Sequence, residues 1–122
     1  MKYIDTYVLA EIAEGNKAYI NYTSGDFLIT DLTLAEFYWV LLRDKSKNLA
    51  DFWYEKLRSY AVAVDQHTLI STMVFRYSNK KKNLSFFDCV GYVFAIQNNM
   101  LFVTGDKEFK DLPHVEHVPN KM

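Results

Sequence analysis

Four acidic residues stand where an apolar run gives way to a helical pattern: Asp5, Glu36, Asp88 and Asp106. If the apolar runs form a parallel sheet, these acids gather at one edge of it, because ligands of such sheets collect beyond the carboxyl ends of the strands. A group of carboxylates suits hard divalent cations such as Mg²⁺ and Mn²⁺. The spacing therefore indicates a metal site, and it favours metal chemistry on phosphate esters.

A structural interpretation also exists for each acid alone. Glu36 and Asp88 each follow a hydroxyl residue, Thr33 and Ser85, by three positions. This is the capping-box spacing, and such a cap contributes about 0.5–2 kcal/mol to a helix. The two remaining acids suit N-cap or turn positions. All four at one edge are harder to explain in this way, because two carboxylates about 4 Å apart near a protein surface repel by on the order of 4 kcal/mol without a cation.

Apolar runs with the length of buried strands alternate with amphipathic helical segments along the chain. Strands are expected at residues 2–5, 27–30, 61–64, 101–103 and, at an edge, 115–118. Helices are expected after the first strand, near residues 18–22, and over residues 33–42, 49–60, 69–77 and 85–98. The alternation predicts an α/β fold with three α/β/α layers and a central, mostly parallel sheet of four or five strands.

Length and charge bound the possibilities further. A chain of 122 residues buries about two-thirds of its unfolded surface, which predicts one domain over residues 1–122. Half of the residues are hydrophobic, so a packed core is expected rather than disorder. The formal net charge of −1 supplies no global positive field that would attract nucleic acid. Any contact with nucleic acid must therefore come from a local basic surface.

Cysteine usage and hydropathy suggest a compartment. The single cysteine, Cys89, excludes an internal disulfide and a cysteine-rich zinc site, which fits a reducing environment. The first residues reach a charge at once and offer no apolar region of a signal peptide. No stretch approaches the roughly 18 apolar residues of a membrane span. We expect a soluble cytoplasmic protein without membrane association.

Taken together, these segments resemble the PIN domain, and specifically the small single-domain toxins of the VapC-like type. Residues 3–6 resemble the opening strand with the first acid of the family, and residues 32–36 resemble the segment that bears the second. Residues 84–88 and 101–106 resemble the segments with the third and fourth acids. The order and spacing agree over nearly the whole chain. Tyr7 departs from the pattern, because the family usually has a small polar residue there.

The resemblance implies a PIN-like nuclease domain that hydrolyses RNA phosphodiester bonds with one or two Mg²⁺ or Mn²⁺ ions. It assigns catalysis and metal ligation to four acids: Asp5, Glu36, Asp88 and Asp106. Of these, Glu36 would ligate the metal directly or through water. It also assigns a supporting role or a substrate contact to the hydroxyls of Thr6 and Thr104. Glu108 is a possible accessory ligand, because some relatives carry another acid at this place.

The resemblance also implies a biological role, the toxin of a type II toxin–antitoxin pair, acting as a homodimer that binds an antitoxin protein. Two alternatives stay open. One is a non-catalytic PIN-like domain that binds protein or RNA. The other is an aspartate-phosphorylated receiver domain. The receiver domain is less favoured than the PIN-like interpretations. Receivers carry an acidic pair near the N-terminus, whereas Asp5 is the only acid by the first strand.

Other polar residues have simpler interpretations. Basic residues cluster in three places, which could hold an RNA backbone but more often form solvated loops: Arg43, Lys45 and Lys47; Lys80, Lys81 and Lys82; Lys107 and Lys110. On a strand, His114 and His117 would face opposite sides, so this segment is expected to be a surface edge without a shared site. Cys89 is expected to be a buried packing thiol.

Overall fold

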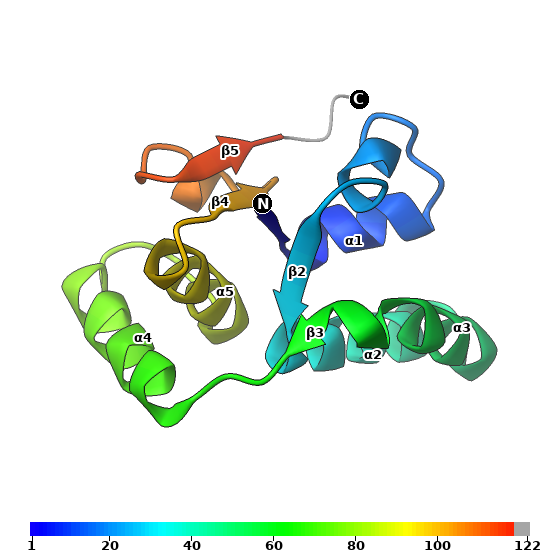
Figure 1. Cartoon of the computed structure of the whole chain (residues 1–122), viewed down its shortest axis with the longest axis horizontal. Coiled ribbons are helices and arrows are strands. Elements are labelled where there is room, and N and C mark those ends of the chain that lie inside the picture. Colours follow the sequence, from blue (N-terminus) through cyan, green and yellow to red (C-terminus); the bar gives the residue numbers. More distant parts are fainter. Residues whose placement is uncertain (119–122) are drawn as a thin grey trace.

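A sheet of parallel strands lies between two layers of helices (Figure 1). The computed structural model describes residues 1–118, which contain the strands Lys2–Ile4 (β1), Phe27–Thr30 (β2), Ala61–Val62 (β3), Leu101–Thr104 (β4) and Val115–His117 (β5). In this part of the chain the strand order is β3-β2-β1-β4-β5, and all four neighbouring pairs are parallel. The expected α/β fold, with a parallel sheet in three layers, is confirmed.

The helices divide between the two faces of the sheet. The α-helices are Thr6–Ala13 (α1), Asp31–Asp44 (α2), Lys47–Leu57 (α3), Gln66–Ser78 (α4) and Phe86–Gln97 (α5). Short 3₁₀ helices span Ile20–Thr23 (η1), Arg58–Tyr60 (η2) and Lys107–Phe109 (η3). Figure 1 shows α4 and α5 on one side of the sheet and α1, α2 and α3 on the other.

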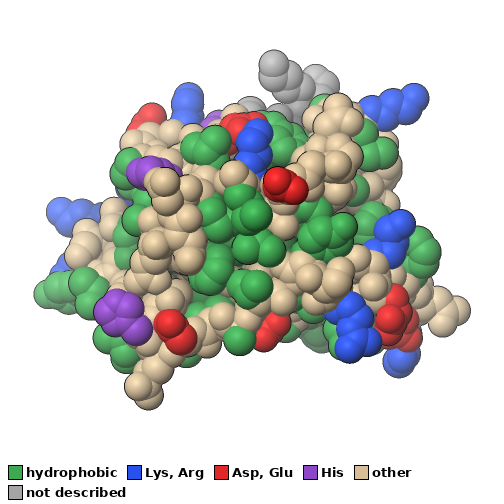
Figure 2. Space-filling model, in the orientation of Figure 1, with side chains coloured by type: hydrophobic (Ala, Val, Ile, Leu, Met, Phe, Trp, Pro, Cys, Tyr) green, Lys and Arg blue, Asp and Glu red, His purple; other side chains and the backbone are tan. Residues whose placement is uncertain are grey.

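Strand alternation divides the apolar core in the same way. Tyr3 and Phe102 point to the side of α5, while the next residue in each strand, Ile4 and Val103, packs with α1, α2 and α3. On both faces these side chains are fully buried. Cys89 is also buried, on the α5 side, which confirms it as a packing thiol. In the space-filling view, hydrophobic side chains lie across the middle of one face and most charged side chains around its rim (Figure 2).

Helix α2 begins earlier than the sequence indicated. Thr33 was expected to cap it, but Thr30 is the N-cap, and its side chain accepts a hydrogen bond from the Thr33 amide at 3.3 Å. The strand ends directly in the helix, so the last hydroxyl of β2 takes the capping role. Glu36 consequently lies in the second turn of α2 and not in the first. The cap of α5 agrees with the prediction, because the Ser85 hydroxyl accepts from the Asp88 amide at 3.1 Å.

Two further expectations differ in extent. The third strand covers only Ala61–Val62, not residues 61–64, because the chain turns toward the Asp65 cap of α4. The expected short helix at residues 18–22 is a 3₁₀ turn, Ile20–Thr23.

Most of the apolar stripe of α4 faces away from the core. Ile70, Met73, Val74 and Tyr77 are exposed, whereas Thr68 and Thr72 are buried. The threonines can be buried because Thr68 donates to Gln97 Oε1 of α5 and Thr72 donates to the Thr68 carbonyl, both at 2.8 Å. The side of α4 that faces α5 thus combines a buried polar pair with the apolar contact of Phe75 and Tyr92. The helix expected over residues 49–60 ends at Leu57 and continues as η2, and its apolar stripe is likewise incomplete, with Phe52 and Tyr60 exposed.

None of the helices between residues 1 and 118 combines the length and apolar composition that crossing a bilayer requires.

A buried tyrosine joins β1 to the start of α2. The Tyr3 hydroxyl lies 3.0 Å from Thr30 Oγ1 and 2.6 Å from Thr33 Oγ1, and it also accepts from the Thr30 amide at 3.2 Å. Burial raises the pKa of Tyr3 to about 12, so the phenol stays protonated. These bonds fix the first turn of α2, which leads to Glu36.

We expect Tyr3→Phe to lower the free energy of unfolding by about 1–3 kcal/mol, because the buried hydroxyls of Thr30 and Thr33 lose their shared partner. Urea denaturation followed by circular dichroism measures the loss. Tyr60→Phe is the matched control, since this ring stacks on Phe27 and its side chain is partly exposed. Equal stability of Tyr3→Phe and the parent protein would show that the network contributes nothing.

Candidate metal centre

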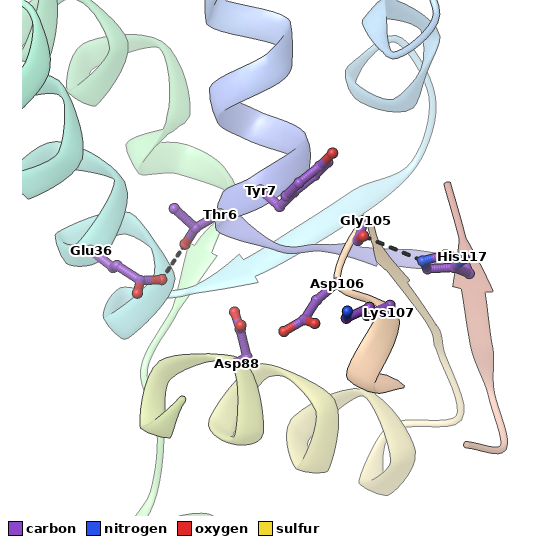
Figure 3. A pocket seen from close by; sticks show the side chains of 8 residues that line it. All are labelled: Thr6, Tyr7, Glu36, Asp88, Gly105, Asp106, Lys107 and His117. Carbon is purple, nitrogen blue, oxygen red and sulfur yellow. Dashed lines mark hydrogen bonds between the residues drawn. The ribbon is translucent and has the colours of Figure 1, made fainter. Parts of the chain in front are cut away.

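An open cavity of about 600 Å³ lies at the carboxyl ends of β1 and β4. Figure 3 shows the residues that line it: Thr6, Tyr7, Glu36, Asp88, Gly105, Asp106, Lys107 and His117. Three of the four acids singled out from the sequence therefore share one cavity. The fourth, Asp5, is buried close enough for Asp88 and Asp106 to raise its pKa.

Asp5 leaves one buried carboxylate oxygen without a partner. Its Oδ1 caps α1 by accepting from the Val8 amide at 3.0 Å, and its Oδ2 has no hydrogen-bond partner within the described residues. Burial raises the pKa of Asp5 well above its usual value, and the charges of Asp88 and Asp106 add to this. The Thr104 hydroxyl and the Val8 amide lower the pKa only in part. An unpartnered buried oxygen of this kind is costly unless a proton or a cation satisfies it.

Asp88 is the second acid with a strongly shifted proton affinity. It projects from the first turn of α5 into the cavity, with Glu36 and Asp106 across from it (Figure 3). Its pKa is raised from 3.8 to about 7, chiefly by burial and in addition by the charges of Glu36 and Asp106, against the lowering effect of the Ser85 hydroxyl. Without a cation Asp5 and Asp88 therefore resist full ionisation near neutral pH.

Two hydroxyls hold the remaining acids in place. Thr6 donates a hydrogen bond to Glu36 Oε1, which links the start of α1 to α2, and burial raises the pKa of Glu36. Thr104 Oγ1 accepts from the Asp106 amide at 3.0 Å. Asp106 Oδ1 in turn accepts from the Glu108 amide at 2.9 Å, so Asp106 caps η3. Thr6, at the start of α1, and Thr104, at the end of β4, thus orient two cavity acids.

The donor set fits a hard divalent cation. Carboxylate oxygens are what Mg²⁺ and Mn²⁺ prefer, and a cation would both satisfy Asp5 Oδ2 and reduce the repulsion among the acids. Among residues 1–118, no three His, Cys, Asp or Glu side chains already stand as a finished set of ligands. Ligation thus requires rotamer adjustments of the cavity acids toward one point.

One cavity residue was missed in the sequence. His117 was assigned to a surface edge, but it lines the cavity, and its Nε2 lies 3.3 Å from the Gly105 carbonyl oxygen. The pairing of β5 with β4 brings His117 opposite Thr104, at the same sheet edge as the acids. Its position at the end of a parallel strand was the available signal. His114 precedes β5 in a left-handed conformation with φ of 61° and is not among the lining residues.

Tyr7, the residue that departs from the family pattern, forms one wall of the cavity. Its ring lies directly against Gly105, and a Cβ at Gly105 would overlap the ring. The large side chain after Thr6 is therefore matched by the absence of a side chain after Thr104. Glu108 is not among the lining residues, so its accessory role stays a prediction.

Comparison with known proteins agrees with this fold. The model of the PIN domain family matches residues 2–115, and the chain belongs to this family. No curated protein sequence matches the chain.

Solved structures of similar fold include several toxins. A toxin–antitoxin complex from Klebsiella pneumoniae superposes with a TM-score of 0.77 at 14% identity, covering 100% of both chains. A VapC toxin from Mycobacterium tuberculosis, described as cleaving the sarcin–ricin loop, has a TM-score of 0.76 at 13% identity over 93% of this chain and 95% of that one. A VapBC complex from Rickettsia felis, bound to promoter DNA, has a TM-score of 0.76 at 20% identity over 97% and 99%. At such identities the likeness concerns the fold.

We expect Gly105→Ala to destabilise the protein by about 1–3 kcal/mol, because the added methyl group overlaps the Tyr7 ring. In a Tyr7→Ala background the same substitution should cost much less, since the obstacle is gone. A double-mutant cycle from urea denaturation measures this coupling. Equal costs of Gly105→Ala in the two backgrounds would contradict the proposed contact.

We expect the metal-free protein to become less stable as pH rises from about 4 to about 7. The pKa values of Asp5 and Asp88 lie higher in the folded than in the unfolded protein, so the folded state binds more protons in this window. Melting temperatures in EDTA across this range measure the slope, and Asp5→Asn should flatten it. A slope of the opposite sign would exclude the raised pKa values.

Proposed function

We propose that this chain is a Mg²⁺- or Mn²⁺-dependent endoribonuclease, a single PIN nuclease domain over residues 1–122 that hydrolyses RNA phosphodiester bonds. Asp5, Asp88 and Asp106 hold the metal, and Glu36 ligates it directly or through water. The observation that carries this proposal is the unpartnered Oδ2 of Asp5, which is buried beside two further acids. Membership of the PIN family supports a nuclease with a divalent metal.

The chain contributes position and charge to the reaction. When bound, the metal ion supplies a water of lowered pKa and stabilises charge on the phosphoryl oxygens. Thr6 holds Glu36 at the cavity, and Thr104 holds the backbone of Asp106. Lys107 lines the same cavity, where its ammonium group can contact a phosphate oxygen of the substrate.

We further propose that the protein is the toxin of a type II toxin–antitoxin pair and acts as a homodimer in the cytoplasm. The similar structures from Klebsiella pneumoniae and Rickettsia felis are toxin–antitoxin complexes, which supports an antitoxin partner. Exposed large apolar side chains on α2 and α3 supply a surface for protein contacts: Trp39, Leu42, Phe52 and Tyr54.

The second candidate is a non-catalytic PIN-like domain that binds protein or RNA. The lack of a finished ligand set among residues 1–118 favours it. The two functions differ in one respect that can be measured, namely whether RNA is cut in a metal-dependent way.

We expect Asp88→Asn to lower Mg²⁺-dependent RNA cleavage by about 10³-fold or more, because several kcal/mol of transition-state stabilisation are lost with the metal. The substitution preserves size, so the circular dichroism spectrum should not change. Asp111→Asn, at an exposed acid outside the cavity, is the matched control and should cleave like the parent protein. Undiminished cleavage by Asp88→Asn, or no metal-dependent cleavage by the parent, would refute the nuclease.

A further inference from the structure

The cations of the described chain divide into two groups. Five form ion pairs with carboxylates: Lys2, Arg43, Lys45, Lys47 and Arg58. Among residues 1–118, six of the cations without an ion pair lie in only two segments, the end of α4 with its following loop, and η3 with the residue after it: Arg76, Lys80, Lys81, Lys82, Lys107 and Lys110. Positive charge is therefore least balanced in residues 76–82, which contain four cations and no Asp or Glu, in a protein whose net charge is −1.

Part of this charge surrounds a second cavity, of about 320 Å³, which we call the basic pocket. It lies at the end of α4, and the residues used below are Arg76, Tyr77, Lys80 and Lys82. None of the residues from 1 to 118 that line it carries a carboxylate. A cavity with cations and without acids suits an anionic ligand.

Two contacts tie the basic pocket to the metal centre. Lys82 Nζ donates to the Glu108 carbonyl at 3.2 Å, and the Glu108 amide donates to Asp106 Oδ1 at 2.9 Å. On the other side, α4, which carries Arg76, packs against α5, which carries Asp88, and the rings of Phe75 and Tyr92 lie 5.1 Å apart between the two helices. A ligand in the basic pocket is thus a neighbour of a ligand in the acidic cavity.

The basic pocket also presents an aromatic ring to solvent. The side chain of Tyr77 is 71% exposed, and Lys80 Nζ lies 4.6 Å from its ring centroid. Surfaces that bind single-stranded nucleic acid combine cations, which follow the backbone, with exposed aromatic rings on which bases stack. An acidic protein segment would need the cations but not the ring.

We propose that the basic pocket binds single-stranded RNA next to the phosphate that is cut, with Arg76 and Lys80 at backbone phosphates and a base stacked on Tyr77. This inference rests on the proposed function, since it takes RNA as the substrate. It also answers a physical difficulty of that function. An acidic cavity in a protein of net negative charge repels RNA, and an adjacent cationic surface offsets this repulsion.

The test measures binding without cleavage. Fluorescence anisotropy of a labelled, mixed-sequence RNA of about 12 nucleotides is followed with the Asp88→Asn protein in EDTA, between about 50 and about 200 mM salt. In this background, Lys80→Ala should weaken binding about threefold or more and reduce the steepness of log K against log salt by about 0.7, the value for one phosphate contact on a single strand. Lys17→Ala removes an exposed cation far from the pocket in sequence and should change neither quantity.

The ring gives an independent readout. Tyr77→Ala should weaken binding at least about fivefold without changing the salt dependence, whereas Tyr77→Phe should bind like its parent, because stacking needs the ring and not the hydroxyl. Both positions are exposed, so the variants should fold, and melting temperatures verify this.

Three results would overturn the inference. The first is no RNA binding by the Asp88→Asn protein, and the second is unchanged affinity in both Lys80→Ala and Tyr77→Ala. The third is competition by poly-glutamate that is as strong as competition by RNA, together with no effect of Tyr77→Ala. The last would assign the pocket to an acidic protein. If the protein binds RNA in this way but does not cut it, only the proposed nuclease function is refuted. If it cuts RNA in a metal-dependent way but Lys80→Ala and Tyr77→Ala bind RNA unchanged, only this inference is refuted.

Discussion

Repulsion among buried carboxylates is the constraint on which the site depends. Asp5 and Asp106 follow neighbouring parallel strands, β1 and β4, and therefore leave the sheet at the same edge. Asp88 reaches this edge from the start of α5. Burial and mutual repulsion raise the pKa values of Asp5 and Asp88, so the folded chain stores an unfavourable interaction that a divalent cation would remove. The folded protein is thus less stable because its carboxylates lie together, and the same arrangement allows them to bind a cation.

The fold tolerates this arrangement because two of the same acids also cap helices. Asp5 caps α1 and Asp106 caps η3, each through Oδ1, and this leaves the second oxygen available. Backbone amides at helix N-termini favour the ionised carboxylate and offset part of the repulsion. The capping and metal-binding interpretations of the sequence are therefore compatible for these two residues. The hydroxyls of Thr6, at the start of α1, and Thr104, at the end of β4, hold Glu36 and the backbone of Asp106.

Sequence reasoning could predict the parallel sheet and the convergence of the acids, because strand ends and helix starts are local signals. It could not predict contacts between side chains distant in the sequence. His117 enters the cavity only through the pairing of β5 with β4, and the match of Tyr7 to Gly105 appears only when two strand ends meet. In α4 the buried side includes two threonines that bond to α5 and within their own helix, while most of the apolar stripe is exposed. Local periodicity carries no information about such pairings.

Binding of a divalent cation by the acids is the central claim, and calorimetric titration with Mn²⁺ tests it most directly. The parent protein should bind one or two ions. Asp5→Asn should lose this binding while keeping its fold, because the amide of Asn has the size of the carboxylate but no negative charge at the buried Oδ2 position. Binding should also raise the melting temperature of the parent protein. If the parent shows no Mn²⁺ binding, or if Asp5→Asn binds Mn²⁺ equally well, the acids at this sheet edge are not a metal centre.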